Sequence, residues 1–151
     1  MIPIFSLGLH LNKNQSHHFL LLLFYFYHLY FTDNERDAFF VREKETNKLL
    51  GFVMINTYMQ KCNEGHSIAE FMIIPKYRRN KIGKKVAFEC FDMYKGNWEV
   101  SPSFGNDSAY KFWKKVIDEY TKNDNIFIDG IFILSPLLFL VLTGRSHHVN
   151  S

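Results

Sequence analysis

Cysteine is scarce in this chain of 151 residues, which holds only Cys62 and Cys90. They are not spaced like metal ligands or a redox pair, so we expect no metal site and treat both as buried or idle thiols of a reducing cytosol. Neither is poised as a nucleophile, because Cys62 is expected in a loop and Cys90 inside a helix. The pairs His17-His18 and His147-His148 lack carboxylate or thiol partners at ligand spacing, which again argues against a metal.

Hydrophobic runs long enough to cross a membrane as a helix are also missing. Phe19–Phe31 and Ile131–Leu142 are the longest apolar stretches, and Ser135-Pro136 interrupts the second. Both fall short of the roughly 20 residues that a membrane span needs. The first lacks a charged leader and a small-residue cleavage site, which argues against a secretory signal. We therefore expect a cytoplasmic protein in which both runs are buried, without membrane contact.

Acidic residues are absent from one segment, Lys76–Lys85, which carries six Lys or Arg. Because the whole chain has a net charge of only +3, its basicity is local. Local basicity predicts a site for one anion rather than a track for nucleic acid. With 47% hydrophobic and 17% aromatic residues, the chain is too apolar to be disordered and fits one domain over residues 1–151.

Three strands are predicted in the first half of the central zone. Asp37–Arg42 and Leu49–Asn56 flank a polar turn at Lys44–Lys48 and form a hairpin. Ser67–Ile74 is the third strand, and it ends at Pro75 because proline cannot donate to a β-ladder.

Two helices and a short strand follow. Apolar residues recur at helical spacing from Ile82, which predicts a helix that ends at Gly96. Trp98–Val100 is a brief strand, and Asn106 or Asp107 caps a second helix. The order is β-β-β-α-β-α, an α/β (α+β) arrangement over residues 33–122. Residues 1–32 and 123–151 are apolar and show neither a clear amphipathic helix pair nor a clean hairpin.

An apolar strand, a basic turn and a glycine at the mouth of a helix follow one another from Glu70 to Lys85. Free amides in such a turn and at a helix N-terminus form a seat for phosphate. The predicted ligand is therefore an elongated polyanion such as a nucleotide cofactor.

These segments resemble the GNAT superfamily of acetyl-CoA-dependent N-acetyltransferases over residues 33–122. The family's phosphate motif, Arg/Gln-x-x-Gly-x-Gly/Ala, stands here as Arg78-Arg79-Asn80-Lys81-Ile82-Gly83. Its second signature, Asn-x-x-Ala-x-x-Phe/Leu-Tyr-x-Lys, stands as Asn106 to Lys115. The resemblance implies a mixed, mainly antiparallel central sheet that splays between two strands and is flanked by helices.

The resemblance also implies where acetyl-CoA binds. Amides from Arg79 to Lys84 would hold the pyrophosphate at the helix N-terminus, and Asn106 would contact the cofactor arm. The backbone of Ile73 and Ile74 would pair with the arm and polarise the thioester carbonyl. The implied cofactor residues are Ile73, Ile74, Arg78, Arg79, Asn80, Lys81, Ile82, Gly83, Lys84 and Asn106.

The same resemblance implies that catalysis uses a base and an acid. Glu70 would take a proton from the attacking amine, directly or through water. Trp113 stands where relatives often place a tyrosine acid, and an indole cannot act as that acid. Tyr110 is the substitute of choice, with Tyr120 or solvent left open. His66, just before the strand, is expected to be exposed to water.

Trp113 is one departure from the family pattern, Lys81 is the other, and two interpretations of the whole chain remain. Lys81 occupies the family's first glycine position, where it would add a phosphate donor. The preferred reading is an N-acetyltransferase that uses a small-molecule or protein amine, does not bind nucleic acid, and has an open oligomeric state, a homodimer included. The alternative is an inactive or incomplete GNAT-fold remnant that binds coenzyme A or a protein partner, because the apolar ends do not match the family.

Overall fold

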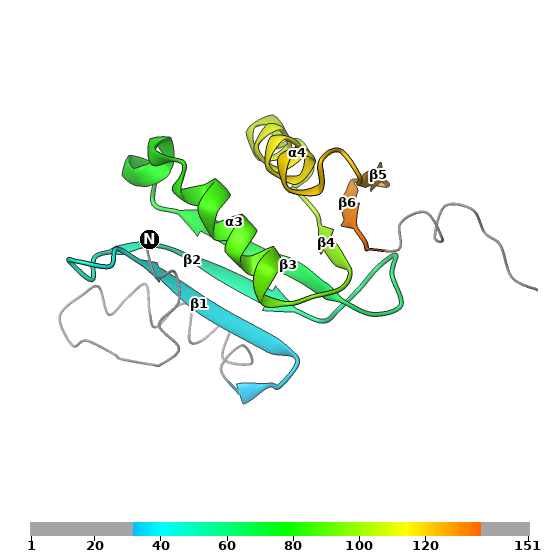
Figure 1. Ribbon diagram of the computed structural model, residues 1–151, viewed down its shortest axis with the longest axis horizontal. Coiled ribbons are helices and arrows are strands. Elements are labelled where there is room, and N and C mark those ends of the chain that lie inside the picture. Colours follow the sequence, from blue (N-terminus) through cyan, green and yellow to red (C-terminus); the bar gives the residue numbers. More distant parts are fainter. Residues whose placement is uncertain (1–31, 137–151) are drawn as a thin grey trace, which may run out of the picture.

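A computed structural model describes residues 32–136 of the chain (Figure 1). The predictions for Phe19–Phe31, for the two histidine pairs and for the part of the second apolar run beyond Pro136 lie outside the described residues. Within residues 32–136, no helix has the length and apolar character needed to cross a bilayer.

Six strands form one mixed sheet. They are β1 (Arg36–Arg42), β2 (Leu49–Asn56), β3 (His66–Ile73), β4 (Trp98–Val100), β5 (Ile126–Ile128) and β6 (Ile131–Leu134). Their order across the sheet is β1-β2-β3-β4-β6-β5, and only β3 and β4 run parallel. This confirms the mixed, mainly antiparallel sheet that the resemblance implied, with β2 and β4 at their predicted bounds.

Two α-helices cover the same face of this sheet (Figure 1). A 3-10 helix, η1 (Pro75–Asn80), leads into α3 (Ile82–Met93), and α4 (Asp107–Thr121) follows β4. Helix α3 ends before the predicted Gly96, because Tyr94 already has extended backbone angles and its hydroxyl donates to the Asp37 carboxylate at 2.7 Å. That contact ties the end of α3 to β1.

The main core lies between the sheet and the two helices. Its buried residues come from every element except η1 and β5, Tyr77 of η1 packs against it, and its largest fully buried side chains include Trp98, Phe132, Ile55 and Ile117. Complete burial of each such side chain contributes roughly 1.5–3 kcal/mol. Both helices are thereby fixed over the sheet.

The C-terminal end of the described part corrects one expectation. Residues 126–134, read from sequence as lacking a clean hairpin, form the β5–β6 hairpin. Asp129 and Gly130 make its two-residue turn with φ values of 50° and 80°. Positive φ at both positions is the turn that matches strand twist, and Asp-Gly is a preferred sequence for it. The hairpin adds two strands beside β4.

Strand β3 leaves its partner β4 halfway along. The parallel ladder pairs His66–Ile68 with Trp98–Val100 and goes no further. On its other side β3 stays paired with β2 as far as Ile73, with one irregularity. Met54 pairs with Glu70 and Ile55 with Ile68, so Ala69 is an extra residue, a β-bulge. The bulge shifts the alternation, so Ile68, Phe71 and Ile73 all pack on the helix side.

Candidate functional site

A cavity of about 450 Å³ opens where β3 separates from β4, beneath the starts of α3 and α4. Four of the residues predicted from sequence to bind the cofactor line it: Ile73, Arg78, Gly83 and Asn106. Its other lining residues are Phe71, Ser108, Ala109, Phe112 and Trp113. The cavity therefore joins the two sequence signatures in space.

The backbone of β3 offers hydrogen-bond donors to this cavity. The N–H of Ile74 donates to the Leu50 carbonyl at 2.8 Å, and the Ile74 carbonyl accepts from the Tyr77 N–H at 2.9 Å, so both of its backbone groups are used. In an antiparallel ladder, bonded and non-bonded pairs alternate, so Phe71 and Ile73 direct their N–H groups away from β2. The donors facing the cavity are those of Phe71 and Ile73.

The N-terminus of α3 is left uncapped by side chains. Lys81 is both the last residue of η1 and the N-cap of α3, with a left-handed backbone (φ 57°, ψ 17°) and no side-chain cap bond. No acidic residue lies in the first turn of α3. The first amides of a helix lack intrahelical partners, and the helix dipole adds positive potential there. This end of α3 favours an anion.

Arg78 connects the open edge of β3 to this turn. Its Nε donates to the Ile73 carbonyl at 2.8 Å, and the side chain lines the cavity. Gly83, in the first turn of α3, is close-packed: a Cβ there would lie 3.1 Å from two ring atoms of Phe112. A larger residue at Gly83 would therefore push Phe112 and alter the cavity.

Asn80, Lys81, Ile82 and Lys84, which the phosphate motif also implies, do not line the cavity. Asn80 and Lys81 are exposed, and Ile82 is buried in the core. Lys84 forms an ion pair with Glu119 of α4. Arg79 belongs to η1.

Helix α4 supplies the opposite wall. The Asn106 Oδ1 accepts from the Ala109 N–H at 3.0 Å, which caps the helix as predicted. Trp113 is only 6% exposed, and its ring lies 4.8 Å from that of Phe71 on β3. In the position where the resemblance expects a tyrosine, Trp113 is thus a buried wall of the cavity.

Neither Tyr110, the predicted acid, nor Glu70, the predicted base, lines the first cavity. Tyr110 contacts the rings of Phe127 and Phe132 and lines a second cavity of about 460 Å³. The two cavities share Asn106. Glu70 is exposed and lines neither cavity; it pairs across the ladder with Met54, which is buried outside the helix-side core. Glu70 therefore lies on the sheet face opposite the helices, just beyond the end of the β3–β4 ladder.

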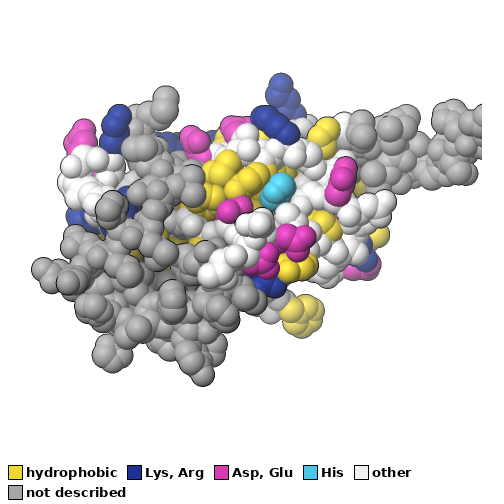
Figure 2. All heavy atoms as spheres, turned by 90° about the horizontal axis from the view of Figure 1, so that it is seen from below, with side chains coloured by type: hydrophobic (Ala, Val, Ile, Leu, Met, Phe, Trp, Pro, Cys, Tyr) yellow, Lys and Arg dark blue, Asp and Glu magenta, His cyan; other side chains and the backbone are white. Residues whose placement is uncertain are grey.

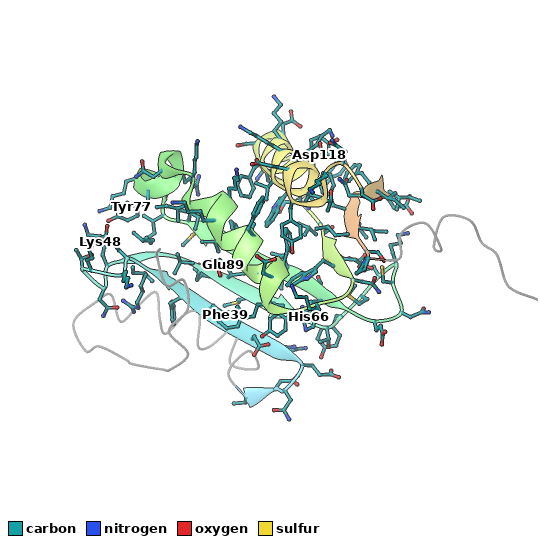
Figure 3. All side chains as sticks on the ribbon, viewed as in Figure 1. Phe39, Lys48, His66, Tyr77, Glu89 and Asp118 are labelled. Atoms are coloured by element: carbon teal, nitrogen blue, oxygen red, sulfur yellow. The ribbon has the colours of Figure 1, made fainter. Side chains whose placement is uncertain are left out.

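His66 corrects the expectation of a water-exposed histidine. It is half-buried, and its ring stacks on Tyr94 at 4.3 Å. Its Nδ1 has no hydrogen-bond partner among the described residues, and burial lowers the pKa of the imidazole. Seen from below, the described part of this surface brings histidine, acidic and hydrophobic side chains close together (Figure 2). Figure 3 places His66 near one end of α3 and Tyr77 at the other.

One buried acid was missed from sequence. Glu99 on β4 is 2% exposed and accepts from the backbone N–H groups of Gln60, Lys61 and Cys62, each at 2.7 Å. It fixes the β2–β3 loop. A lone glutamate in a three-residue apolar strand gave no sign of this role except its place among buried neighbours.

The surroundings of the two thiols disfavour the thiolate form that a nucleophile needs. Burial and the nearby Glu99 raise the pKa of the Cys62 thiol, and burial raises that of Cys90 to about 12. Both therefore stay protonated near neutral pH. No group of His, Cys, Asp and Glu within residues 32–136 is arranged to hold a metal ion.

A family model described as the acetyltransferase (GNAT) family matches residues 9–118. The chain therefore belongs to this family, whose cosubstrate is acetyl-CoA. No curated protein sequence matches the chain.

Solved structures share the fold at low sequence identity. The aminoglycoside antibiotic 6′-N-acetyltransferase AAC(6′)-Ih from Acinetobacter baumannii covers 68% of this chain and 74% of its own, with 12% identity and a TM-score of 0.54. AtaTR bound with AcCoA covers 82% of each chain at 12% identity and a TM-score of 0.56. The KacTA–DNA complex covers 95% of this chain and 91% of its own at 12% identity and a TM-score of 0.57.

Proposed function

We propose that this protein is an N-acetyltransferase that moves the acetyl group of acetyl-CoA to a primary amine by direct attack in a ternary complex. The observation that carries the proposal is the first cavity. It runs from two open β3 amides, those of Phe71 and Ile73, to the uncapped, basic N-terminus of α3. This combination suits a ligand with a polar arm and a phosphate group.

The cofactor would lie along this path. Its pyrophosphate would contact the amides of Arg79 to Lys84 and the free guanidinium nitrogens of Arg78, while Lys81 adds a charge at the turn. Its arm would pair with β3 at Ile73, and the Nδ2 of Asn106 would reach it from α4. Ile74, also implied by the resemblance, would contribute through its position rather than its N–H, which Leu50 already accepts.

Acetyl-CoA supplies the acetyl group as a thioester. The N–H groups of Phe71 and Ile73 would stabilise negative charge on the carbonyl oxygen during attack. Glu70 would accept a proton from the amine, through water where it does not reach directly, and Tyr110 would return a proton to the leaving sulfur. Orientation in the cavity would supply much of the rate.

The remaining proposals concern partners and location. The acceptor would be a small-molecule or protein amine, in a single cytoplasmic domain that binds no nucleic acid. The DNA in the KacTA complex makes an oligonucleotide titration at low and moderate salt worthwhile; salt-sensitive binding would overturn this exclusion. A homodimer is possible in this proposal, and analytical ultracentrifugation would measure whether two copies of the chain associate.

A second candidate is a family member that binds coenzyme A without turnover. Trp113 favours it, because a buried indole stands where relatives place an acid and cannot donate a proton to sulfur. Measurable release of free thiol with any amine acceptor would reject this candidate. A Glu70→Gln variant with unchanged kcat would instead remove Glu70 from the mechanism.

Calorimetric titration with acetyl-CoA tests the proposed site. We expect one-to-one binding by the wild type, strong weakening in Arg78→Gln, and loss in Gly83→Trp, where the new side chain meets Phe112. Arg42→Gln is a matched control, since Arg42 also donates to a backbone carbonyl five residues away, that of Asn47 at 3.0 Å. A folded wild type that does not bind acetyl-CoA would overturn the proposal.

A further inference from the structure

The second cavity differs in charge from the first. Two carboxylates, those of Asp107 and Asp129, line it, and no Lys or Arg of the described residues does. The first cavity has Arg78 in its wall and the basic turn beside it. The two meet at Asn106, so an anionic ligand in one would lie next to a cationic ligand in the other.

Aromatic rings form the floor of the second cavity. Tyr110 and Phe127 meet edge to face at 5.1 Å, and both contact Phe132 beneath them, at 5.6 and 4.4 Å. Contacts to the buried Phe132 hold both rings in place. The faces of such rings attract alkylammonium groups and pack against their methylene chains.

The two carboxylates differ in their ion-pair partners. Asp107, the first residue of α4, has no ion pair among the described residues, so its charge is available to a ligand. Asp129 is held by Lys61, whose Nζ lies 2.6 Å from Oδ2. Lys61 is itself fixed through its backbone N–H by the buried Glu99. The cavity thus keeps a net negative charge that Lys61 limits.

We propose that the second cavity holds the acceptor and that the acceptor is a small aliphatic diamine or polyamine. This inference rests on the proposed acetyltransferase function. One ammonium group lies by Asp107 over the rings of Tyr110 and Phe127. A second amino group, having lost a proton to water, reaches past Asn106 into the first cavity. There its nitrogen attacks the thioester carbonyl, so that the new C–N bond forms and the C–S bond breaks. The further proton that this nitrogen gives up passes through water to Glu70, and the coenzyme A sulfur takes the proton of Tyr110 and leaves as the thiol.

Charge and size both favour this class of acceptor. A neutral acceptor would gain nothing from the Asp107 carboxylate, and an anionic acceptor would be repelled by it, whereas an ammonium group is attracted to it. The cavity of about 460 Å³ accommodates a small ligand body, whereas a folded protein would present its lysine from outside.

Binding of 1,4-diaminobutane to protein saturated with coenzyme A tests the inference without requiring turnover. Calorimetry should show saturable binding, and butylamine, which lacks the second charge, should bind roughly tenfold more weakly. Equal affinity for the two amines, or no binding of either, would overturn the inference while leaving the cofactor site intact. A protein that does not bind coenzyme A would instead fail at the proposed function, and the inference would fail with it.

Substitutions at Asp107 and Lys61 should change the affinity for 1,4-diaminobutane in opposite directions. Asp107→Asn should weaken 1,4-diaminobutane binding by roughly tenfold, and Asp107→Glu should retain most of the affinity. Lys61→Met should tighten binding, because it releases the Asp129 carboxylate. Asp124→Asn, which removes an exposed carboxylate outside both cavities, is the matched control. If Asp107→Asn and Asp124→Asn have equal effects, the inference is wrong.

Discussion

Helices α3 and α4 lie on the same face of the sheet and both begin at the first cavity, yet their N-termini are built in opposite ways. Helix α3 begins at Lys81, without a side-chain cap or an acidic residue in its first turn. Helix α4 begins with a capping Asn106 followed by Asp107. The difference shows which helix end can attract an anion: the α3 end stays open to one, while at α4 the Asn106 side chain already occupies a free amide and the adjacent Asp107 carboxylate repels an anion.

Reversing the charge at the open end should have the largest effect. In Lys81→Asp, acetyl-CoA affinity should fall by roughly one hundredfold, because a phosphate donor is lost and a repulsive carboxylate is added. Lys122→Asp is the control, since Lys122 has a similar left-handed backbone (φ 55°, ψ 43°) at the other end of α4. Calorimetry measures both, and equal losses would show that α3 has no special role.

Replacing the same two lysines by glycine separates strain from ligand binding. A left-handed backbone is unfavourable for lysine, so both Lys81→Gly and Lys122→Gly should gain up to about 1 kcal/mol in the free energy of unfolding. Only Lys81→Gly should lose acetyl-CoA affinity, by roughly tenfold, and should show a weaker dependence on salt. Denaturant melts and titrations at two ionic strengths provide the measurements. Unchanged affinity in Lys81→Gly would assign the lysine to local structure alone.

At the capped N-terminus of α4, substitutions should affect the stability of the fold more directly than at α3. Asn106→Ala should lower the free energy of unfolding by about 1 kcal/mol, because the Ala109 N–H loses its acceptor. Asn106→Asp keeps an acceptor and should retain that stability, while it weakens acetyl-CoA binding by placing a carboxylate in the cavity. Should both variants be equally unstable, the cap would not be what Asn106 contributes.

A feature of the two helix ends could be predicted from the sequence where it depends only on residues near it in the chain. The cap at Asn106 and strands β2 and β4 follow from local sequence, because caps and short apolar runs between turns depend on near neighbours. Placing Arg78 and Gly83 at the cavity needed the family motif. The β5–β6 hairpin was missed although Asp129-Gly130 carried its signal, since strands of three and four residues are too short to show a period.

Other site features had no local signal. The open amides of Phe71 and Ile73 depend on the register of β3 with β2 and on where β4 departs. Burial of Glu99 depends on a loop nearly forty residues away that folds back to donate to it. Such features arise from pairings between distant segments.

The smallest expected effect is on the pH dependence of stability, and it arises at the C-terminal end of α3. There His66 stacks on Tyr94, and burial lowers its pKa below the ordinary value. The unfolded chain therefore takes up the proton first as the pH falls below about 6.5, and stability falls with it. His66→Phe keeps an aromatic ring and should flatten this dependence in melts between pH 7 and pH 5. Parallel curves for the two proteins would contradict the assignment.

Ala69 determines which side chains of β3 face the first cavity. As a spacer of one residue, it decides the parity of β3: with it, Ile68 and Phe71 share a face, and without it one of them would change sides. Replacement of Ala69 by another small residue should be tolerated, whereas its deletion should close the gap or empty part of the core. A single insertion or deletion in β3 would thus decide whether the first cavity, where we propose that the cofactor binds, exists at all, with every other side chain around it unchanged.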